Sequence, residues 1–514
     1  MRIFKTVAGL RSYLEQSRQE QKTIGFVPTM GALHGGHVSL IEQAKAENDV
    51  VTVSIFVNPL QFSLTEDLQL YPRTLEADCL LCEQLGVNVV FAPSSQEMGI
   101  ADGSSGDSPT TTTVMPPQEM ISVLCGQFRK GHFQGVATVV TKLLNVVQPT
   151  RAYFGEKDAQ QLAILRRLVA DLFIPVEIKG CPIIREKSGL ALSSRNAYLT
   201  PEQAEKAVLL SRSLRKAQEA FAGGIYKSTE LMAVVQEELA KESAIRVEYV
   251  EVVNSKTLQP IETIEGTGLL AIATYLDSTR LIDNIMLRRR QPIIAIDGPA
   301  GAGKSTVTRR VASALGLLYL DTGAMYRAMT WLVLDSGIAI NDESAVAELV
   351  SEARLQLIPT SALHAGTQVL INDQDVTEVI RTASVTANVS AISAQPAVRQ
   401  VLVKQQQQWG EKGGIVAEGR DIGTRVFPNA EVKIFLTASV SERARRRWQE
   451  LQAKGDKITI EQLERDIQRR DHLDSTRKAS PLIQAVDAVE IVTDGLTIEE
   501  VTAEIIKLYS SVVS

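Results

Sequence analysis

The sequence predicts an α/β protein in which helices cover parallel sheets, and it predicts more than one domain. Short β-branched runs alternate with amphipathic helical stretches through the first half of the chain, which is the pattern of a parallel sheet. The chain has 514 residues, whereas single hydrophobic cores stop growing at about 250–300. Near residue 292 a hydrophobic run leads directly into a glycine-rich loop, which indicates that a further α/β domain begins there.

The first predicted elements form a strand–helix–strand unit. Residues 23–28 and 49–57 are apolar and β-branched, and residues 38–47 between them have helical composition. The later segment 94–117 is rich in Gly, Ser and Thr and has almost no apolar periodicity. We predict a mobile loop there that could act as a lid.

The region after residue 199 predicts a smaller lobe. Residues 199–241 have helical periodicity, and residues 246–253 and 269–273 have the composition of strands. The pattern breaks over residues 281–292, so we place a domain boundary near Arg290. The predicted domains are residues 1–185, 186–290 and 291–514.

Composition limits the classes of function. The net charge of −6 is spread along the chain, so no positive field would attract a nucleic-acid backbone. No apolar run approaches the roughly 18 residues that a membrane-spanning helix needs, and the first residues lead into a polar stretch without a cleavage site. We therefore expect a cytoplasmic protein whose partners are small molecules, with no nucleic acid and no membrane among them.

The four cysteines are too few and too scattered for a disulfide framework. Cys79 and Cys82 form a C-x-x-C, but they lie in a helical stretch and no second pair follows at zinc spacing. We interpret them as small apolar residues on a helix.

The glycine-rich loop carries the most specific motif of the chain. Residues 298–305 fit G-x-x-x-x-G-K-[ST] between a predicted strand over 292–297 and a helix that begins near Ser305. Backbone N–H groups of such a loop surround ATP phosphates, Lys304 adds a positive charge, and the Ser305 hydroxyl suits Mg²⁺. We therefore predict ATP as a co-substrate and Mg²⁺ as a cofactor. The predicted ATP-binding residues are Gly298, Pro299, Ala300, Gly301, Ala302, Gly303, the catalytic Lys304, Ser305 and Thr306.

Five segments make the second half similar to bacterial cytidylate kinase from about residue 293 to 508, and they occur in the order of that family. They are residues 319–327, 388–399, 418–424, 433–439 and 470–477. The resemblance implies a P-loop domain of the nucleoside monophosphate kinase type, which transfers the γ-phosphoryl group of ATP to CMP or dCMP. The implied acceptor site consists of Thr322, of Arg327, Arg420 and Arg477 for the phosphate, of Arg470 and Asp474 for the sugar, and of Ser390, Arg399 and Asp421 for the base.

Two features of this half leave alternatives open. Glu418 stands where the family often has aspartate, which keeps the charge but adds a methylene group and affects fine positioning. Arg445, Arg446 and Arg447 fit surface salt bridges on a charged helix, although they could also face the nucleotide under a lid.

Two histidines, His34 and His37, stand with intervening glycines where the first predicted strand gives way to its helix. At a helix N-terminus the dipole opposes protonation, so neutral imidazoles could donate N–H groups to nucleotide phosphates. Standing alone, H-x-x-H fits helix-surface histidines or a metal pair equally well, but no third group of ligands lies nearby in the sequence.

Further segments make the first half resemble pantothenate synthetase over about residues 23–284. They are residues 56–62, 71–74, 131–135, 154–162 and 189–196, whereas the segment 94–117 departs from the family. That family consists of Rossmann-like adenylating nucleotidyltransferases with a smaller α+β lobe. It condenses (R)-pantoate with β-alanine through a pantoyl adenylate, releasing AMP and pyrophosphate, and its members pair through the N-terminal domain, so a homodimer is expected.

The resemblance also implies a set of site residues in the first half. His34, His37, Lys157 and Arg195 would be catalytic, with His37 as proton donor or phosphate stabiliser, and Gln61 and Gln161 would bind pantoate and β-alanine. The implied ATP site consists of Met30, Gly31, Ala32, Leu33, His34, Gly35, Gly36, His37, Gly155, Glu156, Lys157, Asp158, Ile184, Leu192, Ser193, Ser194 and Arg195.

The leading hypothesis is therefore a bifunctional enzyme that serves as pantoate–β-alanine ligase and (d)CMP kinase. One alternative makes the first half another nucleotidyltransferase, for example one that joins a cytidylyl group to a small phosphate ester, and the second half a kinase for another acceptor. A second alternative is a nucleotide-sensing scaffold without turnover, against which the intact His37, Lys157, Lys304 and Ser305 argue.

Overall fold

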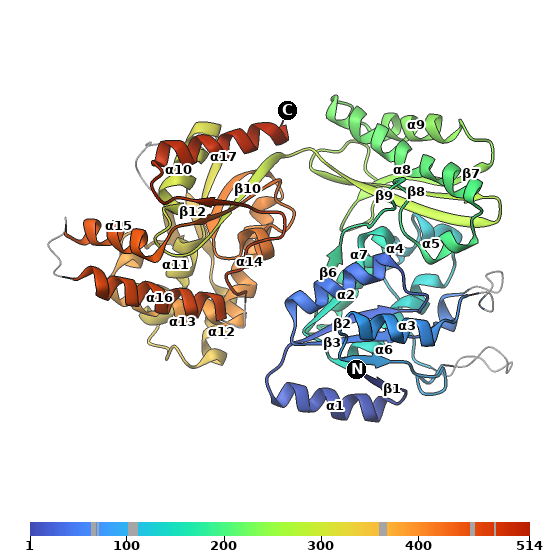
Figure 1. Cartoon of the computed structure of the whole chain (residues 1–514), viewed down its shortest axis with the longest axis horizontal. Helices are drawn as coiled ribbons and strands as arrows, with labels where there is room; N and C mark the ends of the chain where they lie inside the picture. Colours follow the sequence, from blue (N-terminus) through green and yellow to red (C-terminus); the bar gives the residue numbers. More distant parts are fainter. Residues whose placement is uncertain are drawn as a thin grey trace. The chain divides into compact units, whose positions relative to one another are not determined.

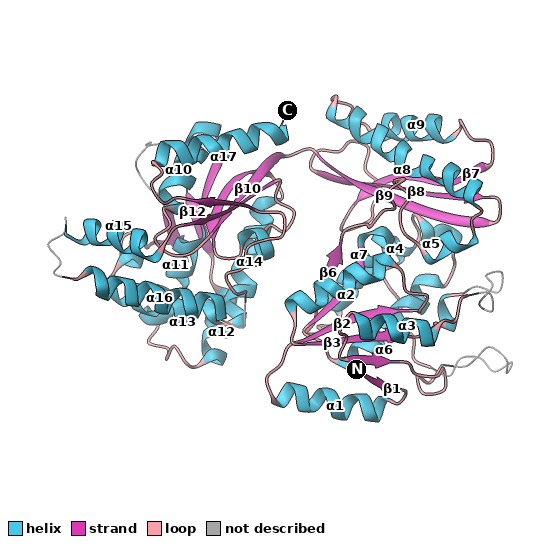
Figure 2. Ribbon diagram, in the orientation of Figure 1, coloured by secondary structure: helices cyan, strands magenta, loops and turns pink. Residues whose placement is uncertain are grey.

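The computed structural model divides the chain into two compact units, Met1–Arg289 and Arg290–Ser514. It describes residues 1–62, 68, 71–100, 111–358, 367–452, 458–476 and 480–513, without the side chains of Glu450 and Val513. Both units are α/β structures (Figures 1 and 2). Within the described part of the chain, no helix is long and apolar enough to cross a membrane.

A six-stranded parallel sheet forms the centre of the first unit. Its order is β1–β4–β3–β2–β5–β6, and its strands are β1 (Arg2–Phe4), β2 (Ile24–Thr29), β3 (Val50–Ile55), β4 (Val89–Phe91), β5 (Arg151–Gly155) and β6 (Glu177–Cys181). Strand β2 pairs in parallel with β3, with Ile24 opposite Val50. This confirms the predicted strand–helix–strand unit.

Both faces of this sheet are covered because successive residues of its strands point to opposite sides. Phe26 packs with α1 (Val7–Gln19), α6 (His132–Val147) and α7 (Ala159–Asp171), whereas the adjacent Val27 packs with α2 (Gly35–Glu47) and α3 (Leu75–Gln84). Because β2 and β5 are parallel neighbours, their carboxyl ends lie at the same edge of the sheet. The loops that lead from there into α2 and α7 carry the predicted site residues.

The smaller lobe of the first unit is an antiparallel sheet with two helices. Strands β7 (Ile245–Asn254), β8 (Thr267–Leu276) and β9 (Thr279–Arg288) pair in sequence order. One face packs on α8 (Pro201–Ala222) and α9 (Ser228–Leu239), and the other packs on α4 (Gln118–Ile121), α5 (Cys125–Phe128) and α7. The break that we predicted over residues 281–292 is wrong up to Arg288, because β9 continues through Asp283 and Asn284, two buried polar residues that hide the alternation of a strand.

A five-stranded parallel sheet forms the centre of the second unit, in the order β11–β15–β10–β16–β17. The strands are β10 (Gln291–Asp297), β11 (Leu318–Asp321), β15 (Gly413–Gly419), β16 (Val432–Thr437) and β17 (Val489–Val492). Helices α10 (Lys304–Leu315) and α17 (Ile498–Val513) cover one face. The other face is covered by α11 (Thr322–Asp335), α13 (Ala383–Ala394) and α14 (Pro396–Gly410).

Smaller elements complete the second unit. A three-stranded antiparallel sheet is formed by β12 (Leu355–Ile358), β13 (Gln368–Ile371) and β14 (Gln374–Asp375), next to α12 (Glu343–Glu352). Helices α15 (Val440–Gln452) and α16 (Ile460–Thr476) lie side by side (Figure 1).

Two further predictions concern the first unit. Cys79 and Cys82 lie on α3, as predicted, and Cys82 is buried in the core. Residues 101–110 of the predicted lid lie outside the described residues. The ends of that segment are held on α6, because Lys142 Nζ donates to the carbonyl of Met98 at 2.8 Å and to Thr111 Oγ1 at 2.7 Å.

Candidate active sites

The loop between β2 and α2 is held by a buried carboxylate. Gly31 and Ala32 both have positive φ, at 86° and 51°, so the chain turns sharply before the helix. Asp78, on α3, accepts hydrogen bonds from the backbone nitrogens of Ala32 at 3.0 Å and Leu33 at 2.8 Å. Asp78 therefore fixes the position of the loop that carries the two histidines.

The two histidines begin the helix, as the sequence predicts, and their hydrogen bonds fix both tautomers. His34 is the N-cap of α2, and its Nδ1 accepts from the backbone nitrogen of Gly36 at 3.1 Å. The Nδ1 of His37 accepts from the backbone nitrogen of His34 at 3.3 Å. An imidazole nitrogen that accepts a hydrogen bond carries no proton, so the proton of each neutral ring is on Nε2.

Burial keeps these imidazoles neutral. It lowers the pKa of His37 to about 3, and the neighbouring His34 adds to the effect. Burial also lowers the pKa of His34, followed by the positive charge of Lys157. Each ring therefore presents an Nε2–H donor at neutral pH.

A cavity of about 270 Å³ brings the predicted residues of the first unit together. It is lined by the predicted residues Met30, His34, Gly36, His37, Gln61, Gly155, Lys157, Asp158, Gln161, Ile184, Leu192, Ser193, Ser194 and Arg195. Gly31, Ala32, Leu33, Gly35 and Glu156 belong to the same loops but are not among its lining residues.

The second wall of the cavity follows β5. A 3₁₀ turn over Glu156–Asp158 leads into α7 and places Lys157 and Gln161 at the cavity. Asn284, on β9 of the small lobe, donates to the carbonyls of Glu156 at 3.0 Å and Lys157 at 2.9 Å. The small lobe thus fixes the turn that carries Lys157.

Several lining residues were not assigned a role from the sequence. Asn58 donates to Gln61 Oε1 at 3.1 Å, and His132 Nδ1 lies 2.8 Å from the Gln61 carbonyl, so both position Gln61. Tyr71 and Arg129 also line the cavity. Asn58, Tyr71 and His132 lie in the segments 56–62, 71–74 and 131–135 that carry the resemblance, which was the available signal. Asp78 lies in none of these segments.

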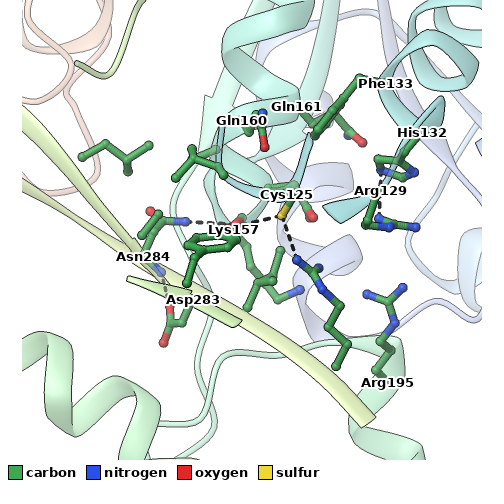
Figure 3. A pocket seen from close by; sticks show the side chains of 18 residues that line it. Cys125, Arg129, His132, Phe133, Lys157, Gln160, Gln161, Arg195, Asp283 and Asn284 are labelled. Carbon is green, nitrogen blue, oxygen red and sulfur yellow. Dashed lines mark hydrogen bonds between the residues drawn. The ribbon is translucent and has the colours of Figure 1, made fainter. Parts of the chain in front are cut away.

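A second cavity of about 40 Å³ adjoins the first (Figure 3). The residues that line both cavities are Arg129, His132, Lys157, Asp158, Gln161 and Arg195. On its lobe side, Cys125 Sγ lies 3.2 Å from Tyr249 Oη and 3.3 Å from Arg280 Nη2. Gln160 donates through Nε2 to two carbonyls, while its buried Oε1 has no hydrogen-bond partner among the described residues.

In the second unit, the glycine-rich loop has the predicted position between β10 and α10. Gly298 has a φ of 148°, and a Cβ there would lie 1.9 Å from the Leu436 carbonyl, so a side chain does not fit. Lys304 is buried and donates to the Pro299 carbonyl at 2.6 Å. Ser305 lies on the first turn of the helix and donates to Glu418 Oε2 at 2.8 Å.

Asp297, the last residue of β10, joins this loop to the loop after β15. Its two carboxylate oxygens accept from the backbone nitrogens of Ile422 and Gly423, both at 2.7 Å. Burial raises the pKa of Asp297 to about 6, although the two hydrogen bonds act in the opposite direction and lower it. The residues that it holds directly follow Arg420 and Asp421, which belong to the predicted acceptor site.

The predicted acceptor residues form two groups. Arg420 donates to Asp474 at 2.8 Å, and burial followed by the charge of Arg420 lowers the pKa of Arg470, so these three lie close together. Buried Arg399 and Asp421 form an ion pair.

The remaining predicted residues lie in several places. Thr322 Oγ1 donates to the Glu418 carbonyl at 2.6 Å, and Arg327 lies 3.5 Å from Asp321. Ser390 is exposed on α13. Arg477 lies outside the described residues.

The arginine run on α15 divides between two roles. Arg445 forms an ion pair with Glu442 at 2.7 Å, as the surface interpretation predicts. Arg446 pairs with Glu442 at 2.8 Å as well, but it also donates to Thr493 and lies next to Gly303 of the glycine-rich loop. The positive charge of Arg447 contributes to the lowered pKa of Arg470, after burial and the charge of Arg420, so Arg447 acts electrostatically on the acceptor group.

Comparison with known proteins is consistent with these two sites. A family model described as pantoate-beta-alanine ligase matches residues 2–286, and one described as cytidylate kinase matches residues 294–511. Proteins called bifunctional pantoate ligase/cytidylate kinase are 59% identical in Nostoc sp. (strain PCC 7120) and 57% identical in Synechocystis sp. (strain PCC 6803), each alignment covering 99% of both chains. The crystal structure of pantothenate synthetase from Thermus thermophilus is 44% identical and superposes with a TM-score of 0.52, covering 55% of this chain and 99% of that one.

Proposed function

Because this chain belongs to the family of bifunctional pantoate ligases/cytidylate kinases, we propose that each of its two units carries one complete active site. The enzyme condenses (R)-pantoate with β-alanine at the expense of ATP, and it transfers the γ-phosphoryl group of ATP to CMP or dCMP. We assign the first reaction to residues 1–185, with residues 186–290 as the lobe that closes its site, and the second to residues 291–514.

In the ligase reaction the substrate supplies the nucleophile. The pantoate carboxylate attacks the α-phosphorus of ATP, the bond to the β-phosphate breaks, and pyrophosphate leaves. The amine of β-alanine then attacks the acyl carbon, the bond to AMP breaks, and the amine loses a proton. The protein therefore has to align the reactants and stabilise negative charge that develops on phosphate oxygens.

The residues of the 270 Å³ cavity suit this task. His34 and His37 present Nε2–H donors, and Lys157 and Arg195 add two positive charges from other segments of the chain. Gln61 and Gln161 offer amide donors and acceptors to the hydroxyl and carboxylate groups of pantoate without adding charge. The assembly of these six side chains around one cavity is the observation on which the ligase assignment rests.

The kinase assignment rests on the glycine-rich loop and on the arginines near Arg420. Guanidinium groups match the geometry of phosphate and stay charged, so Arg327 and Arg420 can bring an acceptor phosphate towards ATP despite its negative charge, while Arg470 and Asp474 suit the sugar. Asp421 can accept from the exocyclic amino group of cytosine, whereas uracil would present a carbonyl to it.

Mg²⁺ fits the donor set beside the glycine-rich loop. The Ser305 hydroxyl and the Glu418 carboxylate are oxygen donors, which Mg²⁺ prefers, and they lie within hydrogen-bond distance of each other. The ion would neutralise charge on the β- and γ-phosphates there.

We further propose that the enzyme acts in the cytoplasm, where its nucleotide substrates are, and that it forms a homodimer through the first unit, as the family likeness implies.

Two reciprocal variants of the full chain test these assignments. His37→Ala should abolish AMP formation from ATP, pantoate and β-alanine while CMP phosphorylation stays within about twofold of wild type, and Lys304→Ala should do the reverse. ADP release should be measured with CMP, dCMP, UMP and AMP as acceptors. If the two activities fall together in either variant, the assignment of one site to each unit is wrong.

A further inference from the structure

Glu418 is held on both oxygens of its carboxylate. Its Oε2 accepts from the Ser305 hydroxyl at 2.8 Å, and its Oε1 accepts from Tyr319 Oη at 2.5 Å. The side chain is buried, with 6% of its surface exposed, whereas Ser305 is accessible. The longer side chain of glutamate at this position thus bridges the glycine-rich loop and β11.

The backbone around Glu418 is fixed by the same segment of β11. Strand β11 pairs in parallel with β15, which places Asp321 opposite Glu418, and Thr322 Oγ1 donates to the Glu418 carbonyl at 2.6 Å. The ring of Tyr319 packs against the apolar cluster under α10, with the Arg309 guanidinium 5.3 Å from the ring centroid. The apolar cluster, Arg309 and Glu418 thus all contact Tyr319, and these contacts fix the direction of its hydroxyl.

These contacts determine how Ser305 is oriented. A serine hydroxyl that binds a cation through its oxygen must donate its proton elsewhere, and Glu418 Oε2 is its acceptor here. If Tyr319 did not donate to Oε1, that oxygen would be buried without this partner, and the carboxylate would be free to rotate away from Ser305.

We propose that Tyr319 is a positioning residue of the kinase site, which acts through Glu418 to orient the Ser305 hydroxyl for the metal ion of Mg·ATP. This rests on the proposed Mg²⁺ site at Ser305. Tyr319 itself touches neither nucleotide nor metal in this role. Its effect should therefore be on the part of the ATP affinity that depends on Mg²⁺.

The test measures the ATP affinity of the kinase site by calorimetry on the full chain, with Mg²⁺ and with chelator, for wild type, Tyr319→Phe, Ser305→Ala and Tyr509→Phe. Because the ligase site also binds ATP, the kinase site is identified as the binding event that Lys304→Ala removes. Tyr509 is the matched control because it packs on the same apolar cluster and loses the same hydroxyl, without a hydrogen bond to Glu418 among those described. Tyr319→Phe should weaken Mg·ATP binding by roughly tenfold, the scale of a hydrogen bond to a charged group, and leave metal-free ATP binding unchanged. Tyr509→Phe should change neither.

A double-variant cycle separates positioning from general support of the fold. In the Glu418→Gln background, Tyr319→Phe should cause no further loss of Mg·ATP affinity, because its partner has already been altered. If Tyr319→Phe weakens ATP binding equally with and without Mg²⁺, or if its effect is additive with Glu418→Gln, the proposal is wrong. If Ser305→Ala leaves the Mg²⁺ effect intact, the proposed metal site fails, independently of Tyr319.

Discussion

The Nδ1 atom of His37 lies 3.3 Å from the backbone nitrogen of His34, and this contact places the imidazole proton of His37 on Nε2. The same arrangement at His34, with Gly36 as donor, gives the second ring the same tautomer. Two backbone N–H groups at the start of α2, which have no partner within the helix, donate to the imidazoles and thereby direct the Nε2–H groups of His34 and His37.

Replacing His37 by either amide tests which ring nitrogen matters. The amide nitrogen of Gln reaches about as far as Nε2, whereas that of Asn corresponds to Nδ1. We expect His37→Asn to lower kcat for AMP formation by roughly 10²–10³, the usual cost of a lost donor to developing charge, and His37→Gln to retain more activity. Steady-state kinetics should be accompanied by CMP phosphorylation as an internal control. Equal losses in the two variants would argue against donation from Nε2.

The lowered pKa of His37 predicts how the stability of the first unit depends on pH. In the unfolded chain this histidine takes up a proton near pH 6.5, whereas in the folded chain it stays neutral down to about pH 3. The unfolded state binds more protons between these values, so the contribution of His37 is fully present above pH 6.5 and is lost as the pH falls. We expect wild type to lose up to about 1.4 kcal/mol per pH unit relative to His37→Gln in this window, measured by denaturant unfolding. Parallel pH profiles for the two proteins would contradict this.

Asp78 should control the histidine loop although it lies on a different helix. Asp78→Ala removes the acceptor of the Ala32 and Leu33 N–H groups, and we expect a loss of about 1.5–3 kcal/mol in the free energy of unfolding together with weaker ATP binding in the ligase assay. Asp78→Asn keeps one acceptor and should lose less. Asp171→Ala, at an exposed ion pair on α7, is the control and should change neither quantity. An unchanged ligase activity in Asp78→Ala would show that the loop holds its shape without the carboxylate.

Asp421 should determine the choice between cytosine and uracil. Asp421→Asn adds a donor that uracil can accept, so the ratio of kcat/KM for CMP over UMP should fall by roughly 10–100-fold, mainly through loss of CMP activity. Because buried Arg399 loses its charged partner, unfolding should be measured as well, and thermal stability is expected to fall. A variant of Asp421 that keeps the wild-type ratio would refute this role.

The fold and much of the candidate site could be predicted because their signals are local. The glycine-rich loop, the strand before it and the histidine pair are contiguous in the sequence, and each lies in the predicted element. Asp78, Asp297 and Tyr319 were not predicted as site residues, because each acts on a segment far away in the chain. Asp78 resembles any acidic residue in a helix until the fold brings it to the loop of residues 31–33.

The sequence also failed to predict strand β9 of the small lobe, for a physical reason. Asp283 and Asn284 interrupt the apolar alternation of β9, but both are buried and satisfied, Asp283 by Arg185 at 2.6 Å and Asn284 by two carbonyls. Polar residues usually indicate the end of a buried strand, although here Asn284 joins the lobe to the turn that carries Lys157, and Asp283 holds Arg185. The side-chain pairings needed to see this are not visible in a single sequence.

The two hydrogen bonds from Ile422 and Gly423 to Asp297 have an evolutionary consequence. The carboxylate of Asp297 connects the strand before the glycine-rich loop with the backbone next to Arg420 and Asp421. A substitution at Asp297 would therefore affect the ATP site and the acceptor site of the kinase together. Selection for a new acceptor would therefore find tolerated changes at the tips of side chains such as Asp421, and a screen of random variants should recover almost none at Asp297.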